Sequence, residues 1–515
     1  MIPSFMLNKT WNRFFVTDFF LICFNDMKRC IFYFSAFFVF LTAPFAEPSL
    51  SGFLENDIEL KKLALEVKKS LLEHKKTSIE NGIDVSLSTG TANFRFNGQN
   101  TSISFNPSAK LSVPQASNLS VSASSKIKIT DGTNNSADTS FSFGIDLISG
   151  TSLERKITLI KSERALLESK RKLQNRALEA EKEYYTKLKQ LFQSASEIAT
   201  AKNTLYEDTV TFEETKAKGY TKNSAKYRQA ELKVLSDAHT VETKIHDFEH
   251  DCAVFATECG TSFSAEQNKK IIADTNFPAE TDSTDFLPQK IPQAEAVDIL
   301  DFEKDFYTKI ESALYEHKIA KMERAAAKDF SLSANGGYTF KNSNTSFSSN
   351  SSGSDTIDAG ISATFKGINV ETGIHIPSDG SAPTYSASAT VKPNSFKTAK
   401  IKNQTNSCNY EEEFLDIKSA EKYYETDIVD KQTELNDIKW SKQTNTKTFD
   451  MYKNLTDDME KLFAQGIVRE TEYLDALANK ELYKFKILMN DIDLIIYNNS
   501  TKLLFCRDAE IQDRK

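Results

Sequence analysis

The segment from Met459 to Phe485, MEKLFAQGIVRETEYLDALANKELYKF, decides the fold because one glycine interrupts a long run of helix-forming residues. From residue 394 to the last residue, Gly466 is the only glycine and there is no proline. A lone glycine of this kind supplies the left-handed backbone conformation that ends a helix. The segment therefore predicts two antiparallel helices that meet at Gly466. Gly219 interrupts residues 151–259 in the same way and predicts a second hairpin turn.

The helices that flank these glycines are long. The positions of glycine and proline predict helices over residues 151–217 and 221–258 around the first turn, and over residues 396–465 and 467–505 around the second. At 1.5 Å per residue the first of these helices would be about 100 Å long, far longer than a globular domain needs. Apolar residues at heptad spacing predict left-handed supercoiling of this helix against a partner. The seam consists of Tyr184, Leu188, Leu191, Ala195, Ile198 and Leu205.

Two stretches, residues 83–148 and 330–393, have the alternating pattern of β-strands, with apolar residues separated by Ser, Thr or Asn. Each stretch contains about four runs of this kind, and a charged helix is expected over residues 53–81. Alternation of this type suits the wall of a membrane barrel, with apolar residues toward lipid and polar residues toward a lumen. A soluble antiparallel sheet with one wet face has the same pattern. The strands alone leave both interpretations open.

The first 46 residues are expected to be a signal region. From Met27, a possible true start, basic Lys28 and Arg29 precede an apolar run that ends at Leu41, which is the order found in secretory signal peptides. No later segment reaches the roughly 18 apolar residues that a membrane-spanning helix needs. A membrane role must therefore come from the strands.

Composition and motifs argue against several functions. The net charge is −8, and no basic stripe with interleaved aromatic residues predicts a nucleic-acid partner. No Walker lysine motif, GxSxG or HExxH occurs, so we expect neither catalysis nor a cofactor. Outside the signal region the cysteines are Cys252, Cys259, Cys408 and Cys506, and none has metal-ligand spacing, so no metal is expected. Cys252 and Cys259 continue an apolar helical stripe and are expected to be buried thiols.

The second half of the chain repeats the order of the first. Tyr184-Tyr185 recurs as Tyr423-Tyr424, and Gly219 recurs as Gly466. Nearly constant offsets of this kind indicate a tandem duplication. The expected organisation is a first repeat over residues 47–260, a linker or equatorial segment over 261–297, a second repeat over 298–506 and a tail over 507–515.

Membrane physics narrows the architecture. A sheet in a bilayer must have no open edge, because unpaired backbone groups in hydrocarbon each cost several kcal/mol. Long helices with narrow apolar seams also need lateral partners. A cyclic oligomer meets both demands. The predicted fold class is an α+β membrane protein, in which strands from several copies form a shared transmembrane β-barrel and long antiparallel helical hairpins form an α-barrel.

With these features the sequence resembles the TolC-like outer membrane efflux proteins, or outer membrane factors, over essentially the whole mature chain. The resemblance is carried by the duplicated order of elements and by three segments: FGIDLISGTSLER, FEETKAKGYTKNSAKYRQAELKV and KLFAQGIVRETEYLDALANKEL. It implies a homotrimer in outer-membrane lipid with its helices in the periplasm. It also implies passive export with a periplasmic adaptor (membrane fusion protein) and an inner-membrane transporter, in a tripartite efflux or type I export system.

The resemblance further implies a periplasmic gate at the hairpin turns. The acids of the gate fall on Glu472 and Asp475, three residues apart on one helix face, where a ring of carboxylates would favour cations. The alternative is that these acids only complement the dipole of the helix that they begin. Phe463 could pack at the gate. The arginine expected two residues after the glycine is replaced by Val468, and Arg469 stands one position later.

Two other interpretations stay open. The chain could be a secreted structural or adhesive coiled-coil protein whose strands make a soluble sheet. It could also be a monomeric eight-stranded barrel with periplasmic helices, because each half offers about four strand-like runs where the resemblance implies two.

Overall fold

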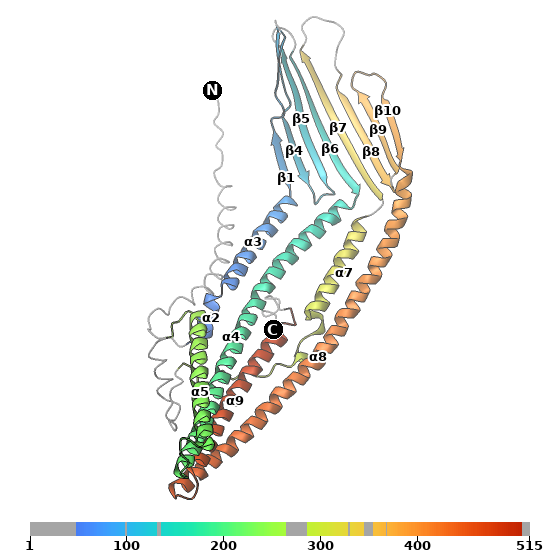
Figure 1. The fold of residues 1–515 in the computed structure, drawn as a ribbon. Helices are drawn as coiled ribbons and strands as arrows, with labels where there is room; N and C mark the ends of the chain where they lie inside the picture. The colour runs from blue at the N-terminus through green and yellow to red at the C-terminus, as the bar shows by residue number, and fades with distance from the viewer. Residues whose placement is uncertain are drawn as a thin grey trace, which may run out of the picture.

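A computed structural model of the chain shows an elongated molecule with a β-sheet at one end and helical hairpins at the other (Figure 1). The structure describes residues 48–97, 100–130, 135–263, 286–327, 330–344, 354–366 and 368–506. The expected signal region, residues 264–285 of the expected linker and the tail lie outside these ranges.

Long helices make up most of the molecule. The α-helices are α2 (Leu50–Asn56), α3 (Ile58–Glu80), α4 (Thr151–Ala217), α5 (Ala225–Glu258), α7 (Thr308–Ala326), α8 (Pro393–Ala464) and α9 (Glu470–Lys502). Two short 3₁₀ helices, η1 (Ile299–Asp301) and η2 (Lys304–Phe306), precede α7. Within the described ranges, no helix is both long enough and apolar enough to cross a bilayer.

The first helix differs from the expectation of one helix over residues 53–81. The chain forms two helices, α2 and α3, because the Asp57 side chain accepts hydrogen bonds from the backbone N–H groups of Glu59 and Leu60 at 2.7 and 3.2 Å. A side chain that caps these free N–H groups starts a new helix at its own position. The return helices also start later than expected, at Ala225 after the capping Ser224 and at Glu470.

The sheet is antiparallel and its strands follow one another in the order of the chain. They are β1 (Asp84–Ser88), β2 (Asn93–Asn97), β3 (Asn100–Phe105), β4 (Ser108–Val113), β5 (Leu119–Thr130), β6 (Asn135–Ile148), β7 (Phe330–Asn344), β8 (Thr356–Phe365), β9 (Ile368–Pro377) and β10 (Thr384–Val391). Among the described residues β1 and β10 do not pair with each other, so the sheet of a single chain is open. The antiparallel sheet and the long helices are as predicted, but the sheet does not close within one chain.

These ten strands occupy eight positions in the sheet. β3 and β4 both pair with β5 in one register, since Phe105 lies opposite Ile127 and Ser108 lies opposite Ser124. In the next position of the sheet, β1 pairs with β4 and β2 pairs with β3. A one-residue bulge between β1 and β2 shifts the register of the second pair relative to the first. Gly90 lies in this bulge with a φ of 67°, a conformation that favours glycine. Each half of the chain therefore contributes four strand positions.

The core of the helical end lies along α4. The predicted seam residues Tyr184, Leu188, Leu191 and Ile198 are buried there, together with Cys252 of α5 and Cys259, which caps the end of α5. The described part of the expected linker also packs into this core. Its buried side chains are Phe286, Leu287 and Ile291.

Along the length of the molecule the helices form two successive levels, each four helices wide. In the level nearer the sheet, the order of contacting helices is α3, α4, α7 and α8. In the level nearer the hairpin turns, the order is α5, α4, α9 and α8 (Figure 1). One lateral edge of the chain therefore consists of β1, α3 and α5. The other edge consists of β10 and α8.

Candidate channel wall and hairpin tips

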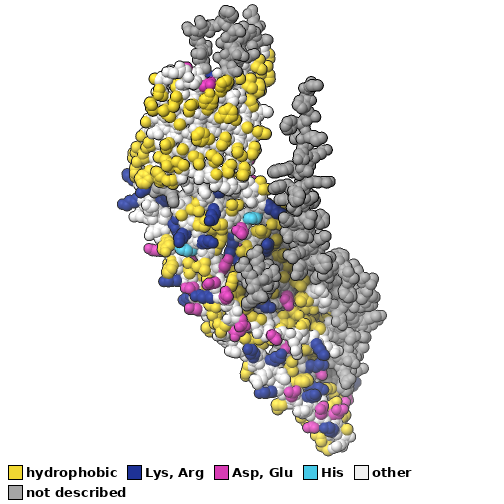
Figure 2. Space-filling view, turned by 180° about the vertical axis from the view of Figure 1, so that it is seen from behind, with side chains coloured by type: hydrophobic (Ala, Val, Ile, Leu, Met, Phe, Trp, Pro, Cys, Tyr) yellow, Lys and Arg dark blue, Asp and Glu magenta, His cyan; other side chains and the backbone are white. Residues whose placement is uncertain are grey.

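The register of the sheet separates its side chains into two faces. Residues opposite each other on neighbouring strands share a face, and one such row crosses all eight strand positions. It consists of Val85, Leu111, Val121, Phe143, Gly336, Ala359, Ile374 and Tyr385. We call the face that contains this row the apolar face. It is visible as a hydrophobic band above the charged helical part of the molecule (Figure 2).

The opposite, polar face holds every charged side chain of the paired strand residues that the structure describes. Five are acidic and five are basic, so the face is neutral. They are Asp84, Asp138, Asp146, Asp358, Glu371, Arg95, Lys110, Lys126, Lys128 and Lys341. His375 lies on the same face, and its Nδ1 is 2.5 Å from Oδ1 of Asp358. This segregation matches the period-two pattern of the sequence.

Serine hydroxyl groups on neighbouring strands of the polar face form hydrogen bonds with each other. Ser122 and Ser142 lie opposite each other with their Oγ atoms 2.6 Å apart, and the Oγ atoms of Ser124 and Ser140 are 2.8 Å apart. Small polar side chains of this kind leave the space above the sheet open to water. The polar face is therefore suited to line an aqueous lumen, while the apolar face is suited to contact lipid.

At the helical end, both glycines have the conformation that the sequence predicts. The φ angles of Gly219 and Gly466 are 78° and 70°. After α8, the N–H of Gly466 donates to Phe463 O at 2.8 Å and that of Ile467 donates to Leu462 O at 2.9 Å. The same pair of bonds closes α4 at Gly219. Two bonds in this pattern form a Schellman cap, which explains why both long helices end here.

The two acids predicted for the gate have different surroundings. Glu472 is exposed, and its carboxylate has no hydrogen-bond or ion-pair partner among the described residues. Oδ1 of Asp475 lies 3.1 Å from Nδ2 of Asn479 and 3.4 Å from Nδ2 of Asn203 on α4, so this carboxylate connects the two hairpins. Leu474, between them, is buried. The spacing of Glu472 and Asp475 in the sequence did not predict that Asn203 of α4 would contact Asp475.

The other two side chains proposed for the gate also have partners at the tip. The Phe463 and Tyr473 rings stack, with centroids 5.7 Å apart and planes 5° apart. Nη1 of Arg469 lies 3.8 Å from Oε1 of Glu214, on the last turn of α4. Arg469 therefore pairs with the other hairpin, although it stands one position later than the resemblance requires.

Sequence reasoning missed a charged group between the two arms of the first hairpin. Nζ of Lys233 on α5 lies 2.6 Å from Oδ1 of Asp208 on α4, and Asp208 also shares a hydrogen bond with Asp237. Burial alone would raise the pKa of Asp208, but its bonds with Lys233 and Asp237 outweigh burial and lower it. The bond with Asp208, together with burial, raises the pKa of Asp237 above its ordinary value of 3.8. Two carboxyl groups that share one proton show this opposite behaviour.

This pair predicts a pH dependence of the first hairpin. Because the pKa of Asp237 is raised, its contribution to stability is complete below pH 3.8 and is lost as the pH rises through the raised value. We therefore expect the ends of α4 and α5 to open more readily at neutral pH than in mild acid. Hydrogen exchange of peptides from this hairpin, with intrinsic rates divided out, measures the free energy of opening.

The variant Asp237→Asn isolates this contribution, because its amide still donates to Asp208 but does not titrate. The difference between wild type and this variant should grow as the pH rises from mild acid to neutral. Asp247→Asn changes an exposed carboxyl group elsewhere on α5 and should behave as wild type. A difference that does not change with pH would exclude the shared proton.

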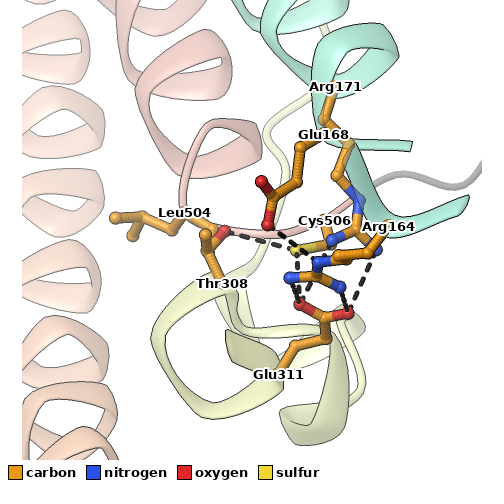
Figure 3. Close-up of polar contacts among 7 residues, drawn as sticks. All are labelled: Arg164, Glu168, Arg171, Thr308, Glu311, Leu504 and Cys506. Atoms are coloured by element: carbon orange, nitrogen blue, oxygen red, sulfur yellow. Dashed lines mark hydrogen bonds and ion pairs between the residues drawn. The ribbon is translucent and has the colours of Figure 1, made fainter. Parts of the chain in front are cut away.

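Further from the tips, a partly buried ion cluster joins the two halves of the chain (Figure 3). Glu311 of α7 accepts hydrogen bonds from both Arg164 and Arg171 of α4, including Nη2 of Arg164 at 2.6 Å and Nη1 of Arg171 at 3.1 Å. Burial opposes ionisation, but the two arginines lower the pKa of Glu311. Sγ of Cys506 lies 3.7 Å from Oγ1 of Thr308 and 3.9 Å from Oε2 of Glu311. The cluster therefore connects α4, α7 and the segment after α9.

The chain is similar to known families and structures along most of its length. Residues 50–291 match the family model of the TP096X N-terminal domain, and residues 292–508 match that of the TP096X C-terminal domain. A comparison with curated proteins finds no match.

Several solved membrane proteins are similar to the chain. A membrane protein from Pseudomonas aeruginosa is 14% identical, with a TM-score of 0.42 and 88% of each chain covered. The open state of the Neisseria gonorrhoeae MtrE outer membrane channel is 13% identical, with a TM-score of 0.43 and coverage of 88% of this chain and 87% of that one. The Vibrio cholerae outer membrane protein VceC is 11% identical, with a TM-score of 0.42 and coverage of 88% and 93%.

The two family matches adjoin without a gap. Since they are the two domains of one family and together span residues 50–508, the chain belongs to the TP096X family.

Proposed function

We propose that the protein is the subunit of a passive outer-membrane export channel. The observation that carries this proposal is the sheet, in which one face is apolar across all eight strand positions and the other holds all charges of the described paired residues. A sheet with one such face toward lipid and one toward water makes a channel wall. The long helices would then form a tube on the periplasmic side.

The open edges favour a ring of identical chains. One edge consists of β1, α3 and α5 and the other of β10 and α8, so the first edge of each copy can pair with the second edge of its neighbour. Such a head-to-tail contact makes a ring when the rotation between neighbouring copies closes, as it would in the proposed channel. Both edges expose apolar side chains, including Leu232 and Leu235 on α5 and Trp440 and Met451 on α8. A homotrimer, as the resemblance implies, would bury them.

The two halves of the chain support the proposed tandem duplication. Each half has a short helix, four strand positions, a long helix, a glycine turn and a return helix. His74 and His317, which correspond in the repeat, each contact the next long helix: Ser162 of α4 at 3.2 Å and Glu413 of α8 at 2.9 Å. The proposed partners, a periplasmic adaptor and an inner-membrane transporter, would meet the ring at its helical end.

The test of the proposal is where the protein is found and in what form. We expect it in the detergent-extracted outer membrane as a heat-modifiable trimer. Recovery in a soluble fraction would exclude the channel and favour the secreted coiled-coil protein. A monomer in the outer membrane would instead favour a barrel closed by a single chain.

We further propose that Glu472 and Asp475 form the selective gate of the ring. In a trimer they would place six carboxylates around the pore, which favours cations. Replacing them in Glu472→Gln/Asp475→Asn should strongly reduce the cation preference, measured as the reversal potential of the reconstituted protein under a salt gradient. If the acids only complement the helix dipole, the preference will stay the same.

A matched control separates the gate from general surface charge. Asp458→Asn removes an exposed carboxylate of α8 near the same turn, which lies 3.5 Å from Lys461 Nζ. This variant should keep the wild-type reversal potential. An equal loss in the control and the gate variant would show that the preference does not come from Glu472 and Asp475.

A further inference from the structure

The number of strands that each chain contributes determines how wide the mouth of the channel is. We propose that all eight strand positions of every chain line one wide, neutral pore that admits large hydrated solutes, up to the size of a small folded domain, without selection by charge. This inference rests on the ring of three chains proposed above.

The four strand positions of the first half of the chain, formed by β1 to β6, are part of the channel wall in this proposal. β3 and β4 continue the ladder of β5 without a register shift, and β1 and β2 continue the ladder of β3 and β4. The apolar row runs through them, since Val121 lies opposite Leu111 and Leu111 lies opposite Val85. The side chains of Val85 and Leu111 are 64% and 38% exposed in the chain, so outside the lipid this row would face water.

The sheet is wider than the helices beneath it. Eight strands spaced about 4.8 Å apart span about 38 Å across the strands, and a tilt of about 40° widens this to about 50 Å along the ring. The four helices α3, α4, α7 and α8 lie side by side, and at a spacing of about 9 Å they span about 36 Å. A wall of eight strands per chain would therefore make the mouth of the channel wider than the helical tube that it joins.

Three chains would bring 24 strand positions to the ring. With a spacing of about 4.8 Å and a tilt of about 40°, such a barrel is about 48 Å across between backbones, which leaves a lumen about 35 to 40 Å wide. Barrels of about 16 to 18 strands already hold an aqueous channel. A domain of about 100 residues has a radius of gyration of about 13 Å, so it would fit.

The chemistry of the polar face matches such a cargo. Its five acidic and five basic side chains cancel, and Lys126 lies opposite Asp138, which lies opposite Lys341. Most other positions on this face are Ser, Thr, Gly or Asn, whose short side chains do not fill the lumen. The wall therefore offers water and hydrogen bonds but no net charge. In this proposal, selection between cations and anions takes place only at the hairpin tips.

Polymer exclusion from the mouth tests the width. The full-length protein is reconstituted in a planar bilayer, and neutral polyethylene glycols of graded size are added to the side of the sheet. A polymer that enters the mouth of the conducting channel lowers its conductance, whereas a polymer that is excluded leaves it unchanged. We expect polymers with a radius of about 12 Å to enter, whereas a 12-stranded barrel with a lumen about 14 Å wide would exclude them.

Cysteine labelling tests whether the outermost strands are part of the wall. In a Cys408→Ser background, which removes an exposed thiol, single cysteines replace Ser86 or Leu87 on β1, and Ser386 or Tyr385 on β10. A hydrophilic maleimide added to proteoliposomes should modify the cysteines at Ser86 and Ser386 and leave those at Leu87 and Tyr385 unmodified. Denaturation in SDS should make all four react.

The possible outcomes separate this inference from the proposed function. A native mass that is not that of a trimer overturns the ring. A trimer that excludes the larger polymers, or that reacts equally at both faces of β1 or β10, keeps the ring and overturns the wide pore. A trimer that admits the polymers and reacts only on the polar face supports both.

Discussion

Replacing Glu311 with glutamine is expected to lower the free energy of unfolding of the helical part by about 3 kcal/mol, because it removes the carboxylate that Arg164 and Arg171 share in a largely buried cluster. The side chains of Arg164 and Arg171 are only 9% and 11% exposed, and that of Glu311 is 22% exposed. Removing one partner from a buried cluster costs far more than the pair contributes, since the remaining charges stay out of water. Urea denaturation followed by helical circular dichroism measures the change.

Two comparisons make this result specific. Glu168→Gln removes a half-exposed carboxylate that also contacts Arg164, and it should cost less than about 1 kcal/mol. The pKa of Glu311 is lowered from its ordinary value of 4.5, so its contribution is present above pH 4.5 and is lost as the pH falls through the lower folded value. That acid dependence should disappear in Glu311→Gln. Equal effects of the two substitutions would show that the cluster does not stabilise the joint between the halves.

Placing a lysine on the apolar face is expected to prevent assembly in the membrane. Ile361 lies in the middle of β8, opposite Ala334 and Thr372, and its side chain is 52% exposed. A lysine on a lipid-facing strand near the bilayer midplane costs about 2–4 kcal/mol, and the proposed homotrimer would carry this change three times. Ile361→Lys should therefore leave little trimer in the outer-membrane fraction, measured by heat-modifiable mobility of the extracted protein.

The neighbouring residue provides a matched control. Ser362 lies on the polar face, between the same strands. Ser362→Lys introduces the same side chain one residue away but directs it toward the proposed lumen, so the amount of trimer should be close to that of wild type. If Ile361→Lys assembles as well as Ser362→Lys, the apolar face does not contact lipid and the proposed channel is wrong.

Local patterns in the sequence predicted the elements well. The helix expected over residues 151–217 is α4, and both glycines end their helices as expected. The four strand-like runs in each half became four strand positions. Local chemistry explains this success, because glycine conformation, helix periodicity and strand alternation depend on residues close together in the chain. The break at Asp57 was missed, since capping depends on the rotation of a single side chain.

The pairing of residues across helices could not be predicted. Asp475 meets Asn203 and Glu311 meets Arg164, although 272 and 147 residues separate them in the chain. Helical periodicity tells which residues share a face but not which helix that face meets or at what height. The sequence therefore pointed to Glu472 and Asp475 without indicating that Asp475 contacts Asn203 of α4, and it gave no sign of the pair of Asp208 and Asp237.

The sequence by itself determined the two hairpins, the two groups of strands and the division of the strands into an apolar and a polar face, because each of these depends on patterns with short periods. Only the tertiary structure decided that, among the described residues, β1 and β10 do not pair with each other and that the free edges of sheet and helices lie on the same two sides. The hairpin at Gly466 also acquired its contacts with Glu214 and Asn203 only there. Long-range packing sets these relations, and no local pattern encodes its register.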